Sequence, residues 1–554
     1  MADLISTTVN VGKLFDRENF FRIPDYQRPF SWSDDNLSDL IGDLIEAPKN
    51  SDYFLGTLVL HKVGVEGGVS TFDVVDGQQR LTALCILLAC LRDSEAFVGD
   101  QDMQGQIQDK LLQREQSLSG IPARNRLHVR DLEAFNNIVI KAGGAVEDDS
   151  VDQLLGYGER KYRAAAKAFR ERLSALPAQS VIELARFILQ RCVVVYLAAS
   201  SFEEAFRLFT IVNDRGQQLR RVDILKANNL APSVVPDPSV RAHYADKWEG
   251  MEEKVGADRF EDIFHSLRLI YTQDKPKADL LKEFEDRILG KPGMPTKGSD
   301  FLDRLGEYVD IYDSLFISCD YLAGTPNSEK FETMMSAMVS NFVASEWRAV
   351  VLQFARKFGK ADLYAFLLLV EKVFLEQWVG GMRKDERYST YTSMLKSIEV
   401  SKRSKAVLDN IEFDGSAIEE ACRSPRFYGA GYSKYLLLRA EICASELSEA
   451  RKFSVRSVEH VLPQNPAAES QWRVDFSQSD IDSVVHSAGN LVLLSKGKNS
   501  SAQNKDFVDK KNTYLSPRVT DFPRSVQVLS EQVWTRAVIE QRTLDFASSV
   551  LVNP

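Results

Sequence analysis

The chain is predicted to be an α+β protein of several domains. Short β-rich runs lie within the first hundred residues, amphipathic helical patterns fill most of residues 100–450, and the last hundred residues read as strand, loop, strand and helix. At 554 residues the chain is too long for one compact core, so two to four domains are expected. We place them at residues 1–230, 231–440 and 441–554.

The composition is that of an ordinary globular protein, with 44% hydrophobic and 27% charged residues. No apolar run approaches the roughly 18–20 residues that span a bilayer. The first thirteen residues lack the basic and then apolar pattern of a secretory signal. We therefore expect no membrane association and a cytoplasmic location. The six cysteines form no CxxC pair, which favours small buried side chains over a structural zinc site.

Charge is unevenly distributed along the chain. The net charge of −10 argues against a protein whose whole surface binds nucleic acid. Residues 451–520, however, contain ten Lys and Arg against seven Asp and Glu. The basic part of this acidic chain therefore lies near its end, where a local contact with DNA remains possible.

The N-terminal region reads as strand, polar turn and helix. The β-rich runs Tyr53–Leu60 and Val69–Val75 are followed by Asp76-Gly77-Gln78-Gln79-Arg80 and then by the apolar segment Leu81–Leu91. The first N–H groups of such a helix favour an anion, the glycine permits close approach, and the arginine can grip a phosphate. The alternative is a helix cap with surface ion pairs.

The middle of the chain is expected to be mainly helical. Apolar residues recur at helical spacing in Lys161–Leu173, Val181–Gln190 and Glu203–Val212. One β-like run, Cys192–Leu197, interrupts them and is a candidate to return to the N-terminal sheet. Clusters of Pro and Gly predict breaks at residues 231–238 and 290–298.

Three blocks in order resemble the sensor half of the GmrSD-type restriction enzymes. The blocks are YQRPFSW from Tyr26, FDVVDGQQRLTAL from Phe72, and Ala205–Phe209 followed by Asn213-Asp214-Arg215-Gly216 and Asp223–Lys226. The resemblance implies a ParB/sulfiredoxin-like α/β core that binds and hydrolyses nucleoside triphosphates and, in some members, senses DNA modification. It also implies a set of nucleotide-binding residues: Asp76, Gly77, Gln78, Gln79 and Arg80, with Tyr26, Gln27 and Arg28 nearby, and Asn213 and Arg215 completing the phosphate pocket. For Asn213 and Gly216 the alternative is a simple helix terminus.

The C-terminal region carries residues suited to phosphodiester hydrolysis. That reaction needs an activated water and a cation that neutralises charge on the phosphate. Glu459 and His460 end a β-like run at Phe453–Val458, and neighbouring strand residues point in opposite directions, so one can face a metal and the other the phosphate. A second run, Leu491–Leu494, precedes a polar helical stretch over residues 500–514. Taken alone, the Glu-His pair is more often structural.

This arrangement resembles the ββα-metal fold of HNH nucleases and, through EHVLPQN, HSAGNLVLL, Asn499 and Tyr514, the nuclease half of the GmrSD family. The resemblance implies that His460 is the general base and that Glu459 and Asn499 ligate Mg²⁺ or Mn²⁺, or another divalent cation. It implies that Asn490 holds the loop around His460. Glu at the first position and Asn at the last depart from the commoner Asp and His, which leaves weak or altered activity open.

Several other polar side chains near this motif have two interpretations. His486 either contacts phosphate or packs the loop before Gly489. A set of lysines reads as a solvated helix face that is also well placed to touch the DNA backbone: Lys496, Lys498, Lys505, Lys510 and Lys511.

The order of sensor, helical region and nuclease matches the single-chain form of the GmrSD-type enzymes. It implies an antiphage endonuclease that cuts modified double-stranded DNA under the control of a nucleoside triphosphate. Because one HNH site cuts one strand, a double-strand break would need a homodimer or two events. The alternative is a nucleotide-regulated DNA-binding protein whose nuclease domain is degenerate and does not cut.

Overall fold

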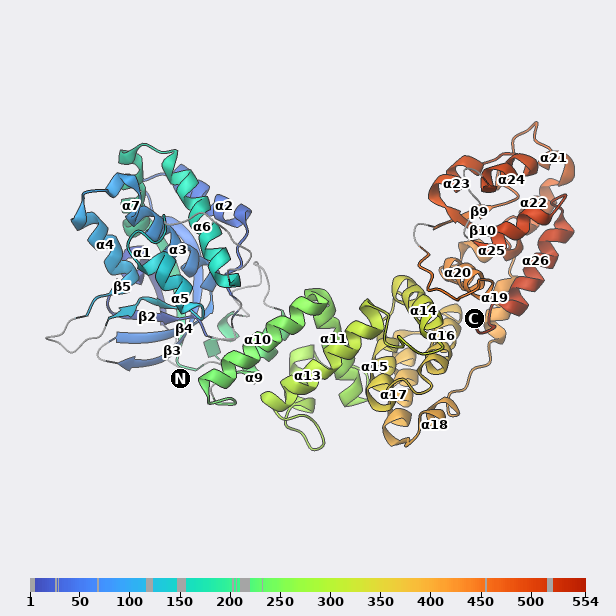
Figure 1. Ribbon diagram of the computed structural model, residues 1–554, viewed down its shortest axis with the longest axis horizontal. Coiled ribbons are helices and arrows are strands. Elements are labelled where there is room, and N and C mark those ends of the chain that lie inside the picture. Colours follow the sequence, from blue (N-terminus) through green and yellow to red (C-terminus); the bar gives the residue numbers. More distant parts are fainter. Residues whose placement is uncertain are drawn as a thin grey trace. The chain divides into compact units, whose positions relative to one another are not determined.

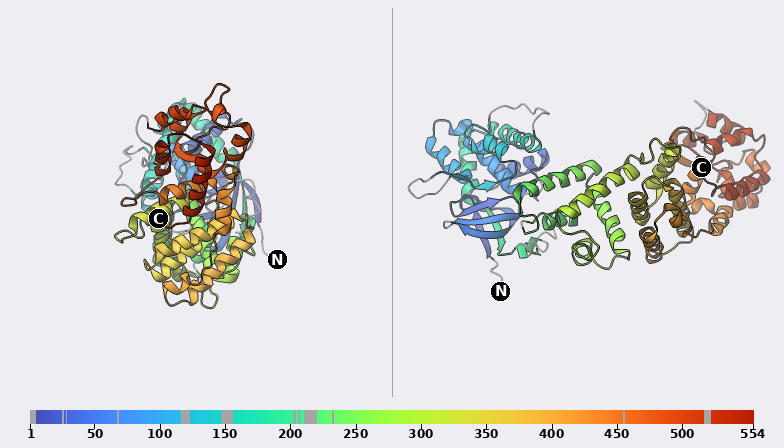
Figure 2. Two further views of the ribbon diagram at one scale, coloured as in Figure 1. Left: turned by 90° about the vertical axis from the view of Figure 1, so that its right-hand side faces the viewer. Right: turned by 60° about the horizontal axis from the view of Figure 1, so that its bottom comes forward.

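The computed structural model describes residues 5–24, 27, 29–66, 69–115, 123–146, 156–201, 204–205, 207–209, 220–231, 233–453, 456–515 and 522–554. It divides into two compact units, residues 1–245 and 246–554, with helix α10 (Pro238–Val255) crossing the boundary. About 60% of the structure is helical, and the strands form a mixed sheet and smaller pairs (Figures 1 and 2). The predicted α+β class with a large helical region is confirmed. The more specific expectations, a ParB/sulfiredoxin-like core and a ββα-metal fold, stay predictions.

The N-terminal unit is built on a six-stranded mixed sheet. Its strand order is β1-β8-β3-β4-β2-β7, in which β8 pairs parallel to β3 and antiparallel to β1. The predicted runs at residues 53–60 and 69–75 are strands β3 and β4, and the run at 192–197 does return to this sheet as β8. The strands of the unit are β1 (Ile5–Asn10), β2 (Asn19–Arg22), β3 (Tyr53–Glu66), β4 (Val69–Asp76), β5 (Leu112–Gln113), β6 (Arg124–Asn125), β7 (Leu127–His128) and β8 (Cys192–Ala199).

Helices cover one face of this sheet (Figure 1). Helix α3 is buried along nearly its whole length because it is apolar on all sides, and it packs with α6 and α7 over Leu58 and Val74. The helices are α1 (Val11–Leu14), α2 (Asp34–Glu46), α3 (Gln78–Arg92), α4 (Gln101–Leu111), α5 (Leu132–Phe135), α6 (Tyr157–Ser174), α7 (Ala178–Arg191) and α9 (Arg221–Asn229), with short turns η1 (Glu95–Phe97) and η3 (Asn136–Ile140).

The second unit begins with a stack of helices that pack against one another. The predicted Pro- and Gly-rich breaks fall between α9 and α10 and before α13. The helices are α11 (Ala257–Thr272), α12 (Leu280–Glu283), α13 (Ser299–Tyr312), α14 (Ser328–Asn341), α15 (Glu346–Phe358), α16 (Leu363–Val379), α17 (Lys384–Val400), α18 (Ser404–Leu408), α19 (Ser416–Arg423) and α20 (Ser433–Cys443), with turns η5 (Phe284–Ile288), η6 (Asp313–Ile317) and η7 (Phe427–Gly429).

The end of the chain adds a strand pair surrounded by helices. Strands β9 (Arg456–His460) and β10 (Leu491–Ser495) are antiparallel and pack on a core around Trp472 and Trp534. The remaining elements are α21 (Trp472–Asp475), α22 (Gln478–Val484), η8 (Ala488–Asn490), α23 (Lys496–Ala502), α24 (Phe507–Leu515), α25 (Pro523–Gln527), η9 (Val528–Ser530) and α26 (Arg536–Ser549). The predicted order of strand, loop, strand and helix is present.

A buried arginine, Arg439, joins the helical stack to this last segment. Arg439 of α20 donates from Nε to Oε1 of Glu371 of α16 at 2.8 Å, and both side chains are fully buried. Arg439 also donates from Nη1 to the carbonyl of Val552 at 3.0 Å. The predicted boundary near residue 440 therefore lies inside one compact unit.

Two predictions from composition can be compared with the structure. None of the described helices is long and apolar enough to cross a membrane. The cysteines are unpaired, and all but the half-buried Cys443 are buried, as expected for small core side chains.

Candidate functional site

The first candidate site is the turn between β4 and α3. Strand β4 ends at Asp76, Gly77 adopts a left-handed conformation with φ of 90°, and α3 begins at Gln78. A Cβ at Gly77 would lie 2.2 Å from Cδ2 of Leu58, so only glycine fits there. The predicted strand, tight turn and helix are confirmed, and the first N–H groups of α3 are left at the turn without a side-chain cap.

The side chains of this turn separate to two sides. Arg80 donates from Nη1 to the carbonyl of Thr57 at 3.2 Å and lies beneath Gly56, where an added Cβ would come within 2.8 Å of its guanidinium. Burial raises the pKa of Asp76, although the Gly77 N–H and Arg80 act against this rise. Burial also lowers the pKa of Arg80, and Asp76 acts against that. Asp76 and Arg80 are thus half-buried and lie close enough for the charge of each to affect the pKa of the other.

Gln79 and Gln27 tie the first two sequence blocks together. Gln79 accepts from the Ser31 N–H at 2.8 Å and donates to the Pro29 carbonyl at 2.9 Å. Gln27 donates from Nε2 to the Val75 carbonyl at 3.0 Å. These bonds bring the first block against the turn, as the prediction of a shared site requires. Tyr26 and Arg28 lie outside the described residues.

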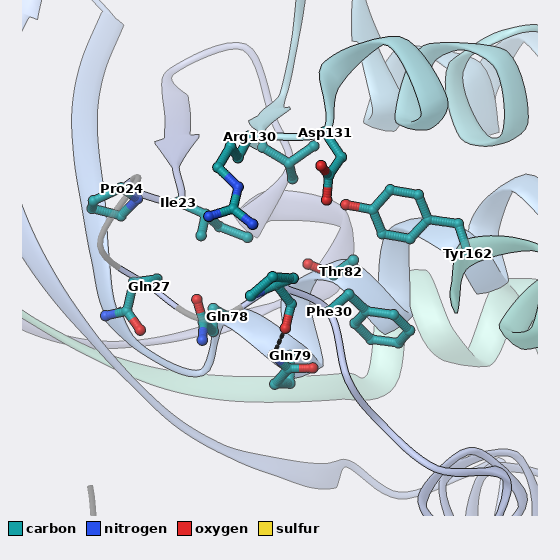
Figure 3. A pocket seen from close by; sticks show the side chains of 12 residues that line it. Ile23, Pro24, Gln27, Phe30, Gln78, Gln79, Thr82, Arg130, Asp131 and Tyr162 are labelled. Atoms are coloured by element: carbon teal, nitrogen blue, oxygen red, sulfur yellow. Dashed lines mark hydrogen bonds between the residues drawn. The ribbon is translucent and has the colours of Figure 1, made fainter. Parts of the chain in front are cut away.

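Gln78 faces a small cavity on the other side of the turn (Figure 3). Its Oε1 atom is buried and has no hydrogen-bond partner within the described part of the chain. The cavity has a volume of about 20 Å³, close to the space of one water molecule, and is lined by Ile23, Pro24, Gln27, Pro29, Phe30, Gln78, Gln79, Thr82, Val129, Arg130, Asp131 and Tyr162. An unpartnered acceptor in a polar cavity is suited to a ligand that donates an N–H or O–H group.

Four polar residues of this cavity were missed by sequence reasoning: Thr82, Arg130, Asp131 and Tyr162. Arg130 and Asp131 follow strand β7, which pairs parallel to β2, so they emerge at the same edge of the sheet as the residues after β2. A two-residue strand leaves too short a pattern for detection. Tyr162 comes from α6 and is buried, and in the sequence it fits the apolar face of an amphipathic helix, so it gave no sign of a site.

The third sequence block also comes to this part of the sheet. Ala205 and Phe209 pack with Val59 and Val75, which point away from the face covered by α3 because Leu58 and Val74 point toward it. Val75 directly precedes Asp76, so the block lies near the turn. Asn213 and Arg215 lie outside the described residues, and their role in a phosphate pocket stays a prediction.

The second candidate site surrounds His460 at the end of β9. Its Nε2 atom lies 3.2 Å from Nδ1 of His486, and its Nδ1 atom lies 3.3 Å from Nε2 of Gln464. The ring of Tyr428 meets His460 edge to face at 4.4 Å. Burial, then His486 and Lys510, lower the pKa of His460 to about 3, so the imidazole is neutral near pH 7. A general base is most effective when its pKa lies near the working pH, so in this buried arrangement the His460 imidazole is a weak base.

Asn490 links the two sides of the loop that carries His460. Its Nδ2 donates to the carbonyls of Leu462 and Val485 at 2.9 and 2.8 Å, while its Oδ1 accepts from the Leu462 N–H at 2.8 Å and from Nε1 of Trp534 at 3.1 Å. The residue is fully buried. Every hydrogen-bonding position of the amide is used to hold the chain, which is the geometry expected of a positioning residue.

Glu459 points into the core, away from His460. Its Oε1 accepts from Nζ of Lys510 at 2.6 Å and from the hydroxyl of Tyr514 at 3.5 Å. Burial raises the pKa of Glu459, although Lys510 and then Tyr514 act against this rise. Lys510 also donates to the His460 carbonyl at 2.6 Å. Lys510 therefore occupies the side of the carboxylate that a cation would take.

Asn499 reaches the same face of β9 as Glu459. It donates from Nδ2 to Oγ of Ser457 at 2.5 Å and to the Val458 carbonyl at 3.2 Å. The two predicted ligands are thus brought to one strand. Among the described residues there is no group of three or more His, Cys, Asp or Glu that could hold a metal ion. A cation on Glu459 and Asn499 fits this arrangement only if the Lys510 ammonium moves away.

The lysines predicted to face DNA occupy different environments. The expected solvated position of Lys510 is wrong, because its side chain is fully buried against Glu459. Lys498 donates to the carbonyls of Thr513 and Tyr514, and Lys511 donates to the carbonyl of Glu531. Lys496 and Lys505 are exposed. The surface available for phosphate contacts is therefore smaller than the spacing of lysines suggested.

Tyr428 and Gln464 were not singled out from the sequence, although both touch His460. Gln464 follows His460 by four residues, so its nearness could have been found. Tyr428 lies in η7, and no local pattern connects it to β9. Of the two interpretations of His486, the structure places its side chain in hydrogen-bonding distance of His460 and stacks it on Tyr428.

The two sites define a class of protein with an α/β unit that carries a polar cavity, followed by a histidine-bearing strand pair. Residues 11–230 match the family model described as GmrSD restriction endonuclease, N-terminal domain, and residues 412–548 match the GmrSD restriction endonucleases, C-terminal domain. The chain belongs to the GmrSD restriction endonuclease family. A comparison with curated proteins found no match. Neither matched segment includes residues 231–411.

Proposed function

We propose that this chain is a phage-defence DNA endonuclease that cuts modified foreign DNA. The chemistry is metal-dependent hydrolysis of HNH type, carried out around His460 in the cytoplasm. A nucleoside triphosphate held by the N-terminal unit gates the cut. The observation that carries the proposal is the position of His460 at the end of β9, where Asn490 holds the loop that follows it, within the segment that matches a restriction endonuclease domain.

In the proposed reaction Gln464 or His486 first releases a ring nitrogen of His460, and that nitrogen then takes a proton from the attacking water. The two ring nitrogens of His460 face His486 and Gln464, which hold the imidazole plane and set which nitrogen carries hydrogen. Asn490 acts as a positioning residue, because its four hydrogen bonds fix the backbone that follows His460. Exposed Lys496 and Lys505, with the half-buried Lys498 and Lys511, would contact DNA phosphates without reading sequence.

A divalent cation, Mg²⁺ or Mn²⁺, would supply charge neutralisation at the phosphate and leaving oxygen. Glu459 and Asn499 remain the proposed ligands, on condition that Lys510 yields its place beside Glu459. DNA binding would then have to separate Lys510 from the carboxylate.

The N-terminal unit supplies the proposed control. The first turn of α3 offers free N–H groups to a phosphate, with Asp76, Gly77 and Arg80 at the turn and Gln78 in the adjoining cavity. In the proposal Gln79 and Gln27 act by holding the first block in place. A double-strand break would need a homodimer, since one such site cuts one strand.

One observation favours a second candidate function. The buried Glu459–Lys510 pair is a complete structural ion pair, and a site that kept it would bind no metal through Glu459. In that case the chain is a nucleotide-regulated DNA-binding protein with a nuclease domain that does not cut.

The test is cleavage of phage DNA by the wild-type chain and by His460→Ala, with Mg²⁺ or Mn²⁺ present. We expect the variant to lose at least about 100-fold in rate, since a general base contributes about 10²–10⁴. His243→Ala, on helix α10, is the matched control and should cut normally. Equal rates for His460→Ala and the wild type would refute His460 as the base. Loss of cleavage in every protein, the wild type included, would favour the second candidate.

A further inference from the structure

The helical stack contains a polar cavity that neither family-matched segment includes. It has a volume of about 230 Å³, is partly open to solvent, and lies between α11, α15 and α17. Its lining residues are His265, Ser266, Arg268, Leu269, Ser345, Glu346, Ala349, Lys384 and Tyr388.

Glu346 gives this cavity an unsatisfied acceptor. The residue is 8% exposed, and its Oε1 accepts from Nη2 of Arg387 at 3.1 Å. Its Oε2 is buried and has no hydrogen-bond partner among the described residues. A buried carboxylate oxygen without a partner costs free energy, so the cavity is suited to a ligand that donates an N–H or O–H group.

The same cavity also favours a negatively charged group. The N-terminal ends of two long helices, α15 at Ser345 and α17 at Lys384, meet there, and helix N-termini favour anions. Lys384 adds a positive charge at the mouth, and His265 and Arg268 line the α11 side. Arg268 lies 3.5 Å from Glu283, Arg387 pairs with Glu346, and Lys275 pairs with Asp385 in the first turn of α17.

Tyr388 supplies a flat side chain to the cavity. Its ring is half-buried, lines the cavity and lies under Nζ of Lys384 at 5.9 Å. Aromatic rings in such positions stack well on nucleobases. One ligand class combines the three requirements: a base with N–H donors, a flat ring and an anionic phosphate.

We propose that this cavity is a second nucleotide site, which binds a nucleoside monophosphate in the helical stack. The base stacks on Tyr388 and donates to Glu346 at the start of α15, and the phosphate lies by Lys384 at the first turn of α17. This site is separate from the turn at Asp76–Arg80 and does not depend on the function proposed for that turn.

Calorimetric titration of the full chain with AMP, GMP, CMP and UMP tests this proposal. The titrations are made in an Arg80→Ala background, so that the N-terminal turn does not dominate the signal. At least one nucleotide should bind with one Lys384-dependent site, and Lys384→Ala should weaken its affinity at least tenfold. Lys402→Ala removes an exposed lysine elsewhere in the stack and should change nothing. Inorganic phosphate should compete with the nucleotide.

A second variant tests the carboxylate. Glu346→Gln turns one acceptor oxygen into a donor and should weaken nucleotide binding while phosphate still competes for what remains. The proposal is overturned if no nucleotide binds at millimolar concentration. It is equally overturned if Lys384→Ala, which is exposed and should fold normally, binds as tightly as its background.

Discussion

The turn at Asp76–Arg80 and the site around His460 use their polar residues in opposite ways. The first is five consecutive residues whose side chains diverge, with Arg80 on one side of the sheet edge and Gln78 in a cavity on the other. The second gathers Tyr428, His460 and His486 from distant parts of the sequence into direct contact. A compact motif therefore does not guarantee a compact site, and in each region some motif residues hold the fold while others face the ligand.

The Glu459–Lys510 pair shows most clearly that residues of a motif can hold the fold rather than face a ligand. Lys510→Ala leaves the Glu459 carboxylate buried without its partner, which should destabilise the second unit by about 3–5 kcal/mol. Chemical denaturation followed by tryptophan fluorescence measures the change. Lys505→Ala, five residues earlier and exposed, is the control. An unchanged midpoint in Lys510→Ala would show that the carboxylate finds another partner, such as a bound cation.

Glu441 is a second buried acid of this unit, and its raised pKa should make the stability of the unit depend on pH. Burial raises the pKa of Glu441 to about 7, with Arg524 acting against the rise. Between pH 4.5 and about 7 Glu441 binds a proton more tightly in the folded state than in the unfolded state. The stability that this proton contributes is complete below about pH 4.5 and is lost as the pH rises to about 7.

Glu441→Gln should flatten this dependence, because the residue no longer titrates. The difference in the free energy of unfolding between Glu441→Gln and the wild type should change by about 3 kcal/mol between pH 4.5 and pH 7. Thermal unfolding between pH 4.5 and 7.5 measures it, with exposed Glu446→Gln as the control. If the free energy of unfolding changed with pH in the same way in the wild type and in Glu441→Gln, the raised pKa of Glu441 would be contradicted.

The smallest expected effect concerns the surface lysines. Lys505→Ala removes one exposed positive charge near β9 and β10 and should weaken DNA binding slightly and equally for all sequences. The slope of log affinity against log salt should fall by about one. An unchanged salt slope would place the DNA on another face of the unit.

The strands and most helices could be predicted because their patterns are local. The runs at 53–60, 69–75, 192–197 and 491–494 are strands, and the Pro- and Gly-rich breaks separate helices. The polar stretch over 500–514 was read as one helix, but it is two, α23 and α24, separated at residues 503–506. Gln503 has a positive φ of 40° and ends α23. The usual sequence signal for such a helix end is a glycine, and this position has none.

The burial of Lys510 had a sequence pattern that was overlooked. Phe507, Lys510, Lys511 and Tyr514 follow the i, i+3, i+4, i+7 spacing of a buried helix face, and Tyr514 is fully buried beside Lys510. A lysine on such a face predicts a buried acid as its partner. Tyr428, Arg130 and the cavity at Glu346 had no comparable pattern, because they depend on how distant elements pack.

The most direct test of the account is cleavage of matched modified and unmodified phage DNA, with and without nucleoside triphosphate. The wild type, His460→Ala and Arg80→Ala are compared in the presence of Mg²⁺ or Mn²⁺. We predict that the wild type cuts modified DNA only, that His460→Ala cuts neither, and that Arg80→Ala binds nucleotide about tenfold more weakly and loses the nucleotide dependence. Cleavage by His460→Ala at the wild-type rate, or full nucleotide control in Arg80→Ala, would contradict the account.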